Sequence, residues 1–189
     1  DDDEEEELEP QQNDSSSSVL VNQIVGAETE LMEAGINVRQ FLVEGRAKSF
    51  IKKNTTPCSL KTRKKPRIFE ESSVVDVLAG RNTTKHPGNI LFRCLVAMNR
   101  DYYKSQVEER ETMIDALIGH CEQYDIHFVD RVTSGYAKEL NYAQVVNKFK
   151  TLLSRKDRGY SDLPRALSNA PMSFPPSNRN NKTPSSQRT

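Results

Sequence analysis

Residues 76–93 constrain the fold of this chain more than any other stretch. An apolar run ends at Gly80, a polar loop with three basic side chains follows, and a helix is expected to begin at Asn89. Asparagine is favoured at a helix start because its side chain can accept a hydrogen bond from an early N–H group. This order predicts a short strand that leads through a glycine-bounded loop directly into a helix.

Periodic apolar patterns predict the elements that follow. Residues 74–78 are rich in β-branched side chains, and residues 126–132 alternate apolar and polar, so both indicate strands. Residues 136–140 indicate a short third strand or a helical turn. Helices are expected to start at Asn89, Ser105 and Asn141, the last two with capping-box partners Glu108 and Gln144. We therefore predict a small α+β domain with the order strand–helix–helix–strand–(strand)–helix, which resembles the core of a winged-helix domain.

Composition limits how much of the chain folds. Only 35% of the 189 residues are hydrophobic and the mean hydropathy is −0.73, which suits one modest domain with long disordered flanks. The predicted organisation is an acidic and polar disordered segment at 1–18, one or two short helices in 19–53, a basic linker at 54–73, the folded domain at 74–158 and a disordered tail at 159–189. The chain starts without a methionine or a signal-peptide pattern, as a fragment of a longer chain would.

Several classes of function are not expected. No apolar run approaches the ~18 residues that a membrane span needs. Three widely spaced cysteines indicate reduced thiols inside the cell. His120, Cys121 and His127 lack the spacing of a zinc site, and no Cys–His or Ser–His pairing indicates a nucleophile. We expect no metal, cofactor, small-molecule substrate or enzymatic activity.

The polar loop is the first candidate site. Arg81, Lys85 and His86 precede a helix N-terminus, where free N–H groups favour anions, so the loop could hold a phosphate of a nucleic-acid backbone. The alternative is structural, with glycines that satisfy turn geometry and with Asn89 as the helix cap. The helix adds a basic stripe that would extend the site or form an ordinary solvated face: Arg93, Arg100 and Lys104.

A dense basic run lies in the predicted linker. Such a run in a flexible segment is typical of a nuclear localisation signal or a nucleic-acid arm, and the alternative is a solvated linker. It consists of Lys61, Arg63, Lys64, Lys65 and Arg67. The expected location is the nucleus, and otherwise the cytoplasm.

The second expected helix has an acidic face. In winged-helix domains the second helix usually enters the DNA major groove, and acidic side chains would be repelled there, so that mode is not expected. We expect a non-enzymatic nuclear module that binds nucleic acid or another anionic partner, such as an acidic protein, through the loop at 81–89. The alternative is a protein-interaction module that uses the acidic helix or residues 19–53.

The motif of residues 76–96 resembles the domain of unknown function 6824 family, which is expanded in diatoms and related algae. The resemblance covers roughly residues 74–153. It is carried by Asp76, Leu78, Gly80, Arg81, His86, Gly88, Asn89, Phe92, Arg93, Leu95 and Val96. The chain departs from the family pattern at Asn82, which replaces a loop glycine, at residues 125–129, which replace a Gly-Gly-Arg-Phe-Leu strand entry, and at Tyr136, where the family usually has tryptophan. The family brings no established activity, so function must be argued from the site.

Overall fold

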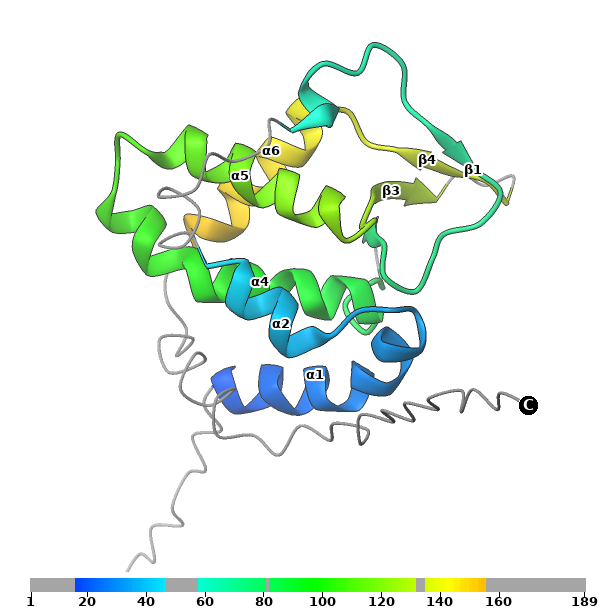
Figure 1. Cartoon of the computed structure of the whole chain (residues 1–189), viewed down its shortest axis with the longest axis horizontal. Coiled ribbons are helices and arrows are strands. Elements are labelled where there is room, and N and C mark those ends of the chain that lie inside the picture. The colour runs from blue at the N-terminus through cyan, green and yellow to red at the C-terminus, as the bar shows by residue number, and fades with distance from the viewer. Residues whose placement is uncertain (1–15, 47–57, 81, 132–134, 156–189) are drawn as a thin grey trace, which may run out of the picture.

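The fold is organised around one central helix. The computed structural model describes residues 16–46, 58–80, 82–131 and 135–155. Helix α4 (Pro87–Ser105) lies among the other helices, and a four-stranded sheet stands beside them (Figure 1). The other helices are α1 (Ser16–Glu33), α2 (Val38–Glu44), the short 3₁₀ helix η1 (Ser59–Lys61), α5 (Arg110–Gln123) and α6 (Tyr142–Leu153). The α+β class and the small single domain are as predicted.

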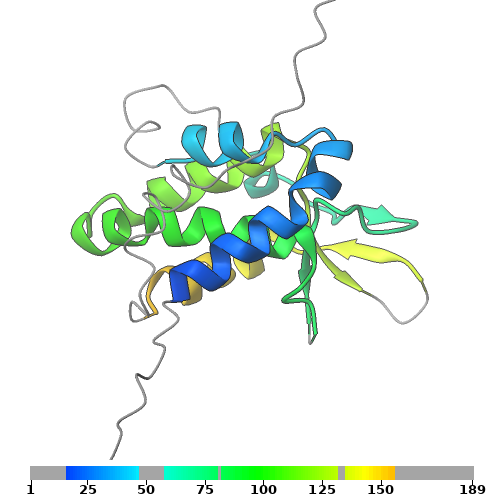
Figure 2. The same cartoon turned by 90° about the horizontal axis from the view of Figure 1, so that it is seen from below.

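The sheet mixes parallel and antiparallel pairs. Its strands are β1 (Ile68–Phe69), β2 (Val77–Ala79), β3 (Phe128–Arg131) and β4 (Ala137–Glu139), in the spatial order β1-β4-β3-β2. Strand β2 pairs parallel with β3 across the crossover through α4 and α5, and the remaining pairs are antiparallel. In Figure 2, β1 (teal) and the β3–β4 hairpin (yellow) extend away from the helices. From β2 to α6 the order of elements is the predicted one, whereas β1 was not foreseen.

Helices α1 and α2 belong to the core, and this corrects the predicted start of the domain at residue 74. Helix α1 begins at Ser16, inside the segment predicted to be disordered, and buries Leu20, Ile24 and Leu31 in the main hydrophobic cluster. The end of α2 is held by polar contacts: Asn99 Nδ2 donates to Gly45 O at 2.8 Å, and His120 Nε2 lies 2.8 Å from Phe41 O. Because α4 is apolar on more than one side, it needs this additional layer.

Two further boundaries differ from the predictions. From Cys58 onward the predicted linker is packed on the domain, with Cys58 and Leu60 buried. Ser105 ends α4 instead of starting α5, because its hydroxyl donates back to Tyr102 O and α5 begins only at Arg110. The predicted capping box of Asn141 and Gln144 is confirmed at the start of α6. Residues 1–15, 47–57 and 156–189, which include most of the predicted disordered flanks, lie outside the described residues.

Candidate anion-binding site

The junction of β2 and α4 shows what most of the 76–96 motif does. Gly88 lies so close to the preceding chain that a Cβ atom would stand 2.2 Å from Asp76 O and 2.4 Å from Val75 O. Its N–H donates to Val74 O at 3.0 Å. Only glycine allows helix and strand to approach this closely.

Asn89 is not the helix cap that the sequence indicated. Helix α4 begins at Pro87 with His86 as the N-cap residue, so Asn89 lies inside the first turn. Its side chain accepts from Leu78 N at 2.6 Å and donates to Leu78 O at 2.9 Å, and it also donates to Thr83 Oγ1 at 3.1 Å. The amide therefore pairs with the outer edge of β2 as a neighbouring strand would, and it fixes the loop to the helix.

Asp76 is a second structural residue of the motif. Its buried carboxylate accepts from Ser73 N at 2.6 Å and from His127 N at 3.2 Å, and His127 Nδ1 lies 3.5 Å from it. It thus joins the turn before β2 to the start of β3.

A hollow of about 490 Å³ opens where the parallel strands β2 and β3 end and α4 begins. Open sheets commonly bind ligands outside the carboxyl ends of parallel strands. Gly80 turns the chain there with a φ of +107°, and Thr83 Oγ1 donates to Gly80 O at 3.2 Å. The hollow is lined by Leu78, Ala79, Gly80, Asn82, Thr83, His86, Asp130 and Arg131.

The charge around this hollow comes from few groups. Lys85 and Arg131 are exposed, and neither forms an ion pair within the described part of the chain. Arg81 lies outside the described residues. His86 is half-buried; burial and the Arg131 guanidinium lower its pKa below 6.5, against the opposing pull of the Asp76 and Glu30 carboxylates. His86 is therefore harder to protonate than an ordinary histidine and contributes little positive charge at pH 7. Asp130 contributes a carboxylate to the rim.

The basic stripe of α4 does not form the continuous surface that its spacing predicted. Arg93 is half-buried and donates to Gln23 Oε1 at 2.9 Å and to Thr84 O at 2.7 Å. Arg100 is buried, with 6% of its surface exposed, and donates to Leu152 O at 3.2 Å. Lys104 is exposed, but the 19-residue helix places it about 28 Å from the loop. The stripe is interrupted because Arg93 contacts α1 and Arg100 contacts the end of α6, whereas Lys104 stays exposed.

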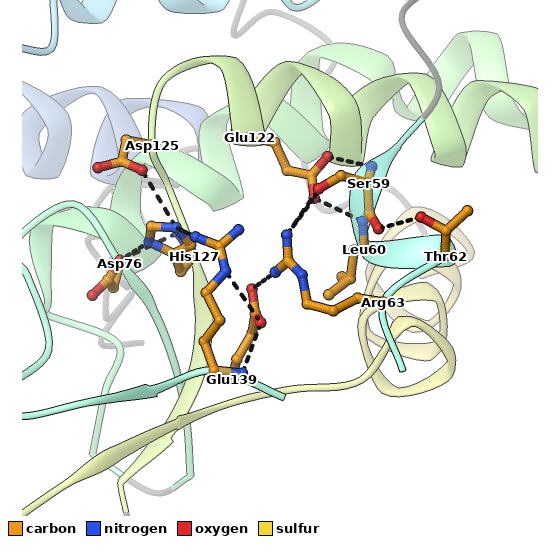
Figure 3. A network of polar contacts seen from close by, with 10 residues as sticks. Ser59, Leu60, Thr62, Arg63, Asp76, Glu122, Asp125, His127 and Glu139 are labelled. Carbon is orange, nitrogen blue, oxygen red and sulfur yellow. Dashed lines mark hydrogen bonds and ion pairs between the residues drawn. The ribbon is translucent and has the colours of Figure 1, made fainter. Parts of the chain in front are cut away.

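Three of the five cations in the basic run at 61–67 contact carboxylates of the domain, and Figure 3 shows Arg63 among its partners. Arg63 forms an ion pair with the buried Glu139 and lies 4.0 Å from Glu122. The backbone N–H of Arg67 donates to Glu139 Oε2 at 3.1 Å, and its guanidinium lies 3.8 Å from the same atom. Lys61 pairs with Asp115 at 2.8 Å. Of the five predicted signal residues, Lys64 and Lys65 are exposed without such a partner among the described residues.

Two acidic side chains of α5 contact the basic run and the short helix η1. Glu122 accepts from the N–H groups of Ser59 and Leu60 at 2.8 and 2.9 Å, and from Ser59 Oγ (Figure 3). Asp115 accepts from Lys61 and from the Tyr142 hydroxyl. Asp115 and Glu122 therefore hold residues 59–63, whereas the Glu111 side chain on the same helix is 88% exposed.

A second hollow, which the sequence did not indicate, adjoins the first. It measures about 360 Å³ and is lined by Glu71, Ser72, Arg131, Gly135, Tyr136 and Ala137. Arg131 lines both hollows. Sequence reasoning missed it because Arg131 stands in an unremarkable Asp-Arg step, and only the strand pairing brings it beside residues 71 and 136.

Comparison with known families decides the classification. Residues 76–155 match the family described as Domain of unknown function (DUF6824). This match confirms the resemblance of residues 74–153 that the motif indicated. No curated protein and no solved structure matches the chain. The DUF6824 segment spans β2 to α6, so α1, α2 and β1 complete its core from outside the matched range.

Other kinds of site find little support around the DUF6824 domain. In the part of the chain that the structure describes, no three histidine, cysteine or acidic side chains gather as metal ligands. Cys58, Cys94 and Cys121 are buried free thiols, and burial raises the pKa of Cys94 to about 12, which disfavours the reactive thiolate. None of the described helices combines the length and the apolar character required to traverse a bilayer.

Proposed function

We propose that the DUF6824 domain is a non-enzymatic module that binds phosphate groups of nucleic acid at the hollow between β2, β3 and α4. The observation that carries the proposal is a pair of exposed cations at the place where two parallel strands end: Arg131, which lines the hollow, and Lys85, which directly precedes the lining residue His86. Neither forms an ion pair with another described residue. The attraction rests on these cations and not on the helix start, because Pro87 has no N–H group and those of Gly88 and Ile90 already donate to Val74 O and His86 O.

Several other basic side chains already have partners within the molecule, which limits the size of the proposed nucleic-acid interface. Arg63, Arg93 and Arg100 are already held by carboxylates, an amide oxygen or carbonyls. Cations with internal partners contribute little to a polyanion contact, whereas free ones can release counterions on binding. The proposed footprint is therefore the loop and Arg131, and it excludes the stripe along α4.

A salt titration of the full chain tests this proposal. Binding of a labelled oligonucleotide is measured by fluorescence anisotropy for the wild type, for Lys85→Ala with Arg131→Ala, and for the matched control Lys104→Ala at the far end of α4. The double variant is expected to reduce the slope of log K against log salt by about two, and Lys104→Ala to leave it unchanged. Equal slopes for all three proteins would refute the assignment of this hollow.

The alternative of a protein-interaction module has less support. Its acidic helix uses Glu122 and Asp115 for internal contacts, and residues 16–44 form part of the core. The nuclear location stays a prediction. Import receptors bind basic runs in extended chains, and here Arg63 and Arg67 are tied to Glu139. The nuclear location is tested by comparing the cellular distribution of the wild type with that of Lys64→Ala plus Lys65→Ala. This double variant leaves the ion pairs of Arg63 and Arg67 intact.

A further inference from the structure

We infer that the preferred ligand is single-stranded, with a phosphate at the β2–α4 hollow and a neighbouring base stacked on Tyr136 in the second hollow. This inference rests on the proposed function and adds the class of nucleic acid. Its starting point is that Arg131 lines both hollows, so one basic residue borders both the hollow proposed for a phosphate and a hollow of different chemistry.

The sheet places the second hollow next to the first. Arg131 of β3 pairs directly with Ala137 of β4, which brings residue 136, just before β4, close to the end of β3. Tyr136 immediately precedes Ala137 and lines the same hollow as Arg131. A chain whose phosphate contacts Arg131 can therefore present its adjacent base to Tyr136.

The side chains of the second hollow suit a base better than a phosphate. Tyr136 is 52% exposed, which is unusual for a large aromatic ring, and base-on-aromatic stacking is a main source of affinity for single strands. Glu71 would repel a phosphate, yet a carboxylate accepts hydrogen bonds from the amino groups of bases. Ser72 adds a hydroxyl that donates or accepts. The volume of about 360 Å³ is within the range of small-ligand sites.

A duplex does not fit this arrangement. Bases in a duplex are paired and stacked on each other, so their faces are not available to a protein ring unless the strand opens. Single strands expose those faces, and RNA also offers a 2′-hydroxyl that can donate to a carboxylate. Asp130, on the rim of the first hollow beside Arg131, is such an acceptor.

The test compares single-stranded RNA, single-stranded DNA and duplex DNA of one sequence, each bound to the full chain. Single strands are expected to bind about tenfold or more tightly than duplex. Tyr136→Ala should weaken single-strand binding by about tenfold, and Tyr136→Phe, which keeps the ring, should not. Val107→Ala is the matched control, because Val107 is an exposed hydrophobic side chain that lines neither hollow.

The outcomes separate this inference from the function on which it rests. Equal affinity for duplex and single strand, or an unchanged affinity for Tyr136→Ala, overturns the inference, while sensitivity to Lys85→Ala with Arg131→Ala would still uphold the phosphate site. Failure of every nucleic acid to bind at low salt overturns both. Tighter binding of RNA than DNA, reduced by Asp130→Ala, would assign the sugar contact to Asp130 and support the inference.

Discussion

Replacing Asn89 with alanine removes the link that joins strand, loop and helix. The Asn89 amide, 8% exposed, holds both backbone groups of Leu78 at 2.6 and 2.9 Å. Val77 N–H donates to His127 O on the β3 side, so the backbone groups of Leu78 point away from β3 and have Asn89 as their partner. Alanine leaves a buried N–H and a buried carbonyl without that partner.

The expected loss follows from these two groups. Each buried backbone group that loses its partner costs about 1–3 kcal/mol. Alanine regains about 0.5 kcal/mol through its better helix propensity. The free energy of unfolding should therefore fall by about 1.5–5.5 kcal/mol, which at a denaturant dependence of about 2 kcal/mol per M moves the urea midpoint by about 1–3 M.

Urea denaturation of the full chain, followed by circular dichroism, measures this loss. Asn147→Ala is the matched control, because Asn147 is exposed on α6 and should change stability by less than about 0.5 kcal/mol. Asn89→Asp should be at least as costly as alanine, since a carboxylate cannot donate to Leu78 O. If Asn89→Ala and Asn147→Ala have the same midpoint, the amide does not act as a strand partner.

Three further predictions concern other contacts. Gly88→Ala should destabilise the fold by about 3 kcal/mol, because its Cβ would stand 2.2 Å from a backbone oxygen. Gly26→Ala, on the open side of α1, should stabilise the fold by up to about 1 kcal/mol. Thermal denaturation compares the two variants, and a similar loss of stability in both would contradict the close approach at Gly88. Glu139→Gln should lower the free energy of unfolding by about 3 kcal/mol, because Arg63 loses its buried carboxylate partner. Glu111→Gln, which removes an exposed pair with Lys150, should cost less than about 1 kcal/mol. Equal unfolding midpoints for the two variants would argue against a stabilising Arg63–Glu139 ion pair. Burial lowers the pKa of His120 below 6.5, so the stability that the neutral ring contributes is present above pH 6.5 and is lost as the pH falls toward the folded-state pKa. Below pH 6.5 the slope of unfolding free energy against pH should be smaller for His120→Gln than for the wild type, by up to about 1.4 kcal/mol per pH unit. An unchanged slope would show that the buried ring does not titrate in this way.

Local patterns predicted those parts of the fold that local rules control. The order from β2 to α6 follows from β-branched runs and helical periodicity, and the Asn141–Gln144 capping box needs only residues three apart. The 76–96 motif drew attention to the correct junction. The pattern suggested a cap for Asn89, but tertiary contact with Leu78 determines its role.

Contacts distant in sequence explain what was missed. Glu139 lies 76 residues from Arg63, so nothing near the basic run indicates that a carboxylate will hold it. Strand β1 has two residues and no periodicity to detect. Arg100 lies on the polar side by helical spacing, yet the end of α6 covers it. Arg131 and Tyr136 became candidates only when strand pairing brought the two hollows together.

The most direct test of the central claim is a ¹H–¹⁵N NMR titration of the full chain with a short single-stranded oligonucleotide. The proposed site predicts shift changes confined to residues 80–86, 130–131 and 135–136, which saturate together and diminish with added salt. Changes centred on Lys104 or on the 61–67 run, with the loop and hairpin unaffected, would contradict it.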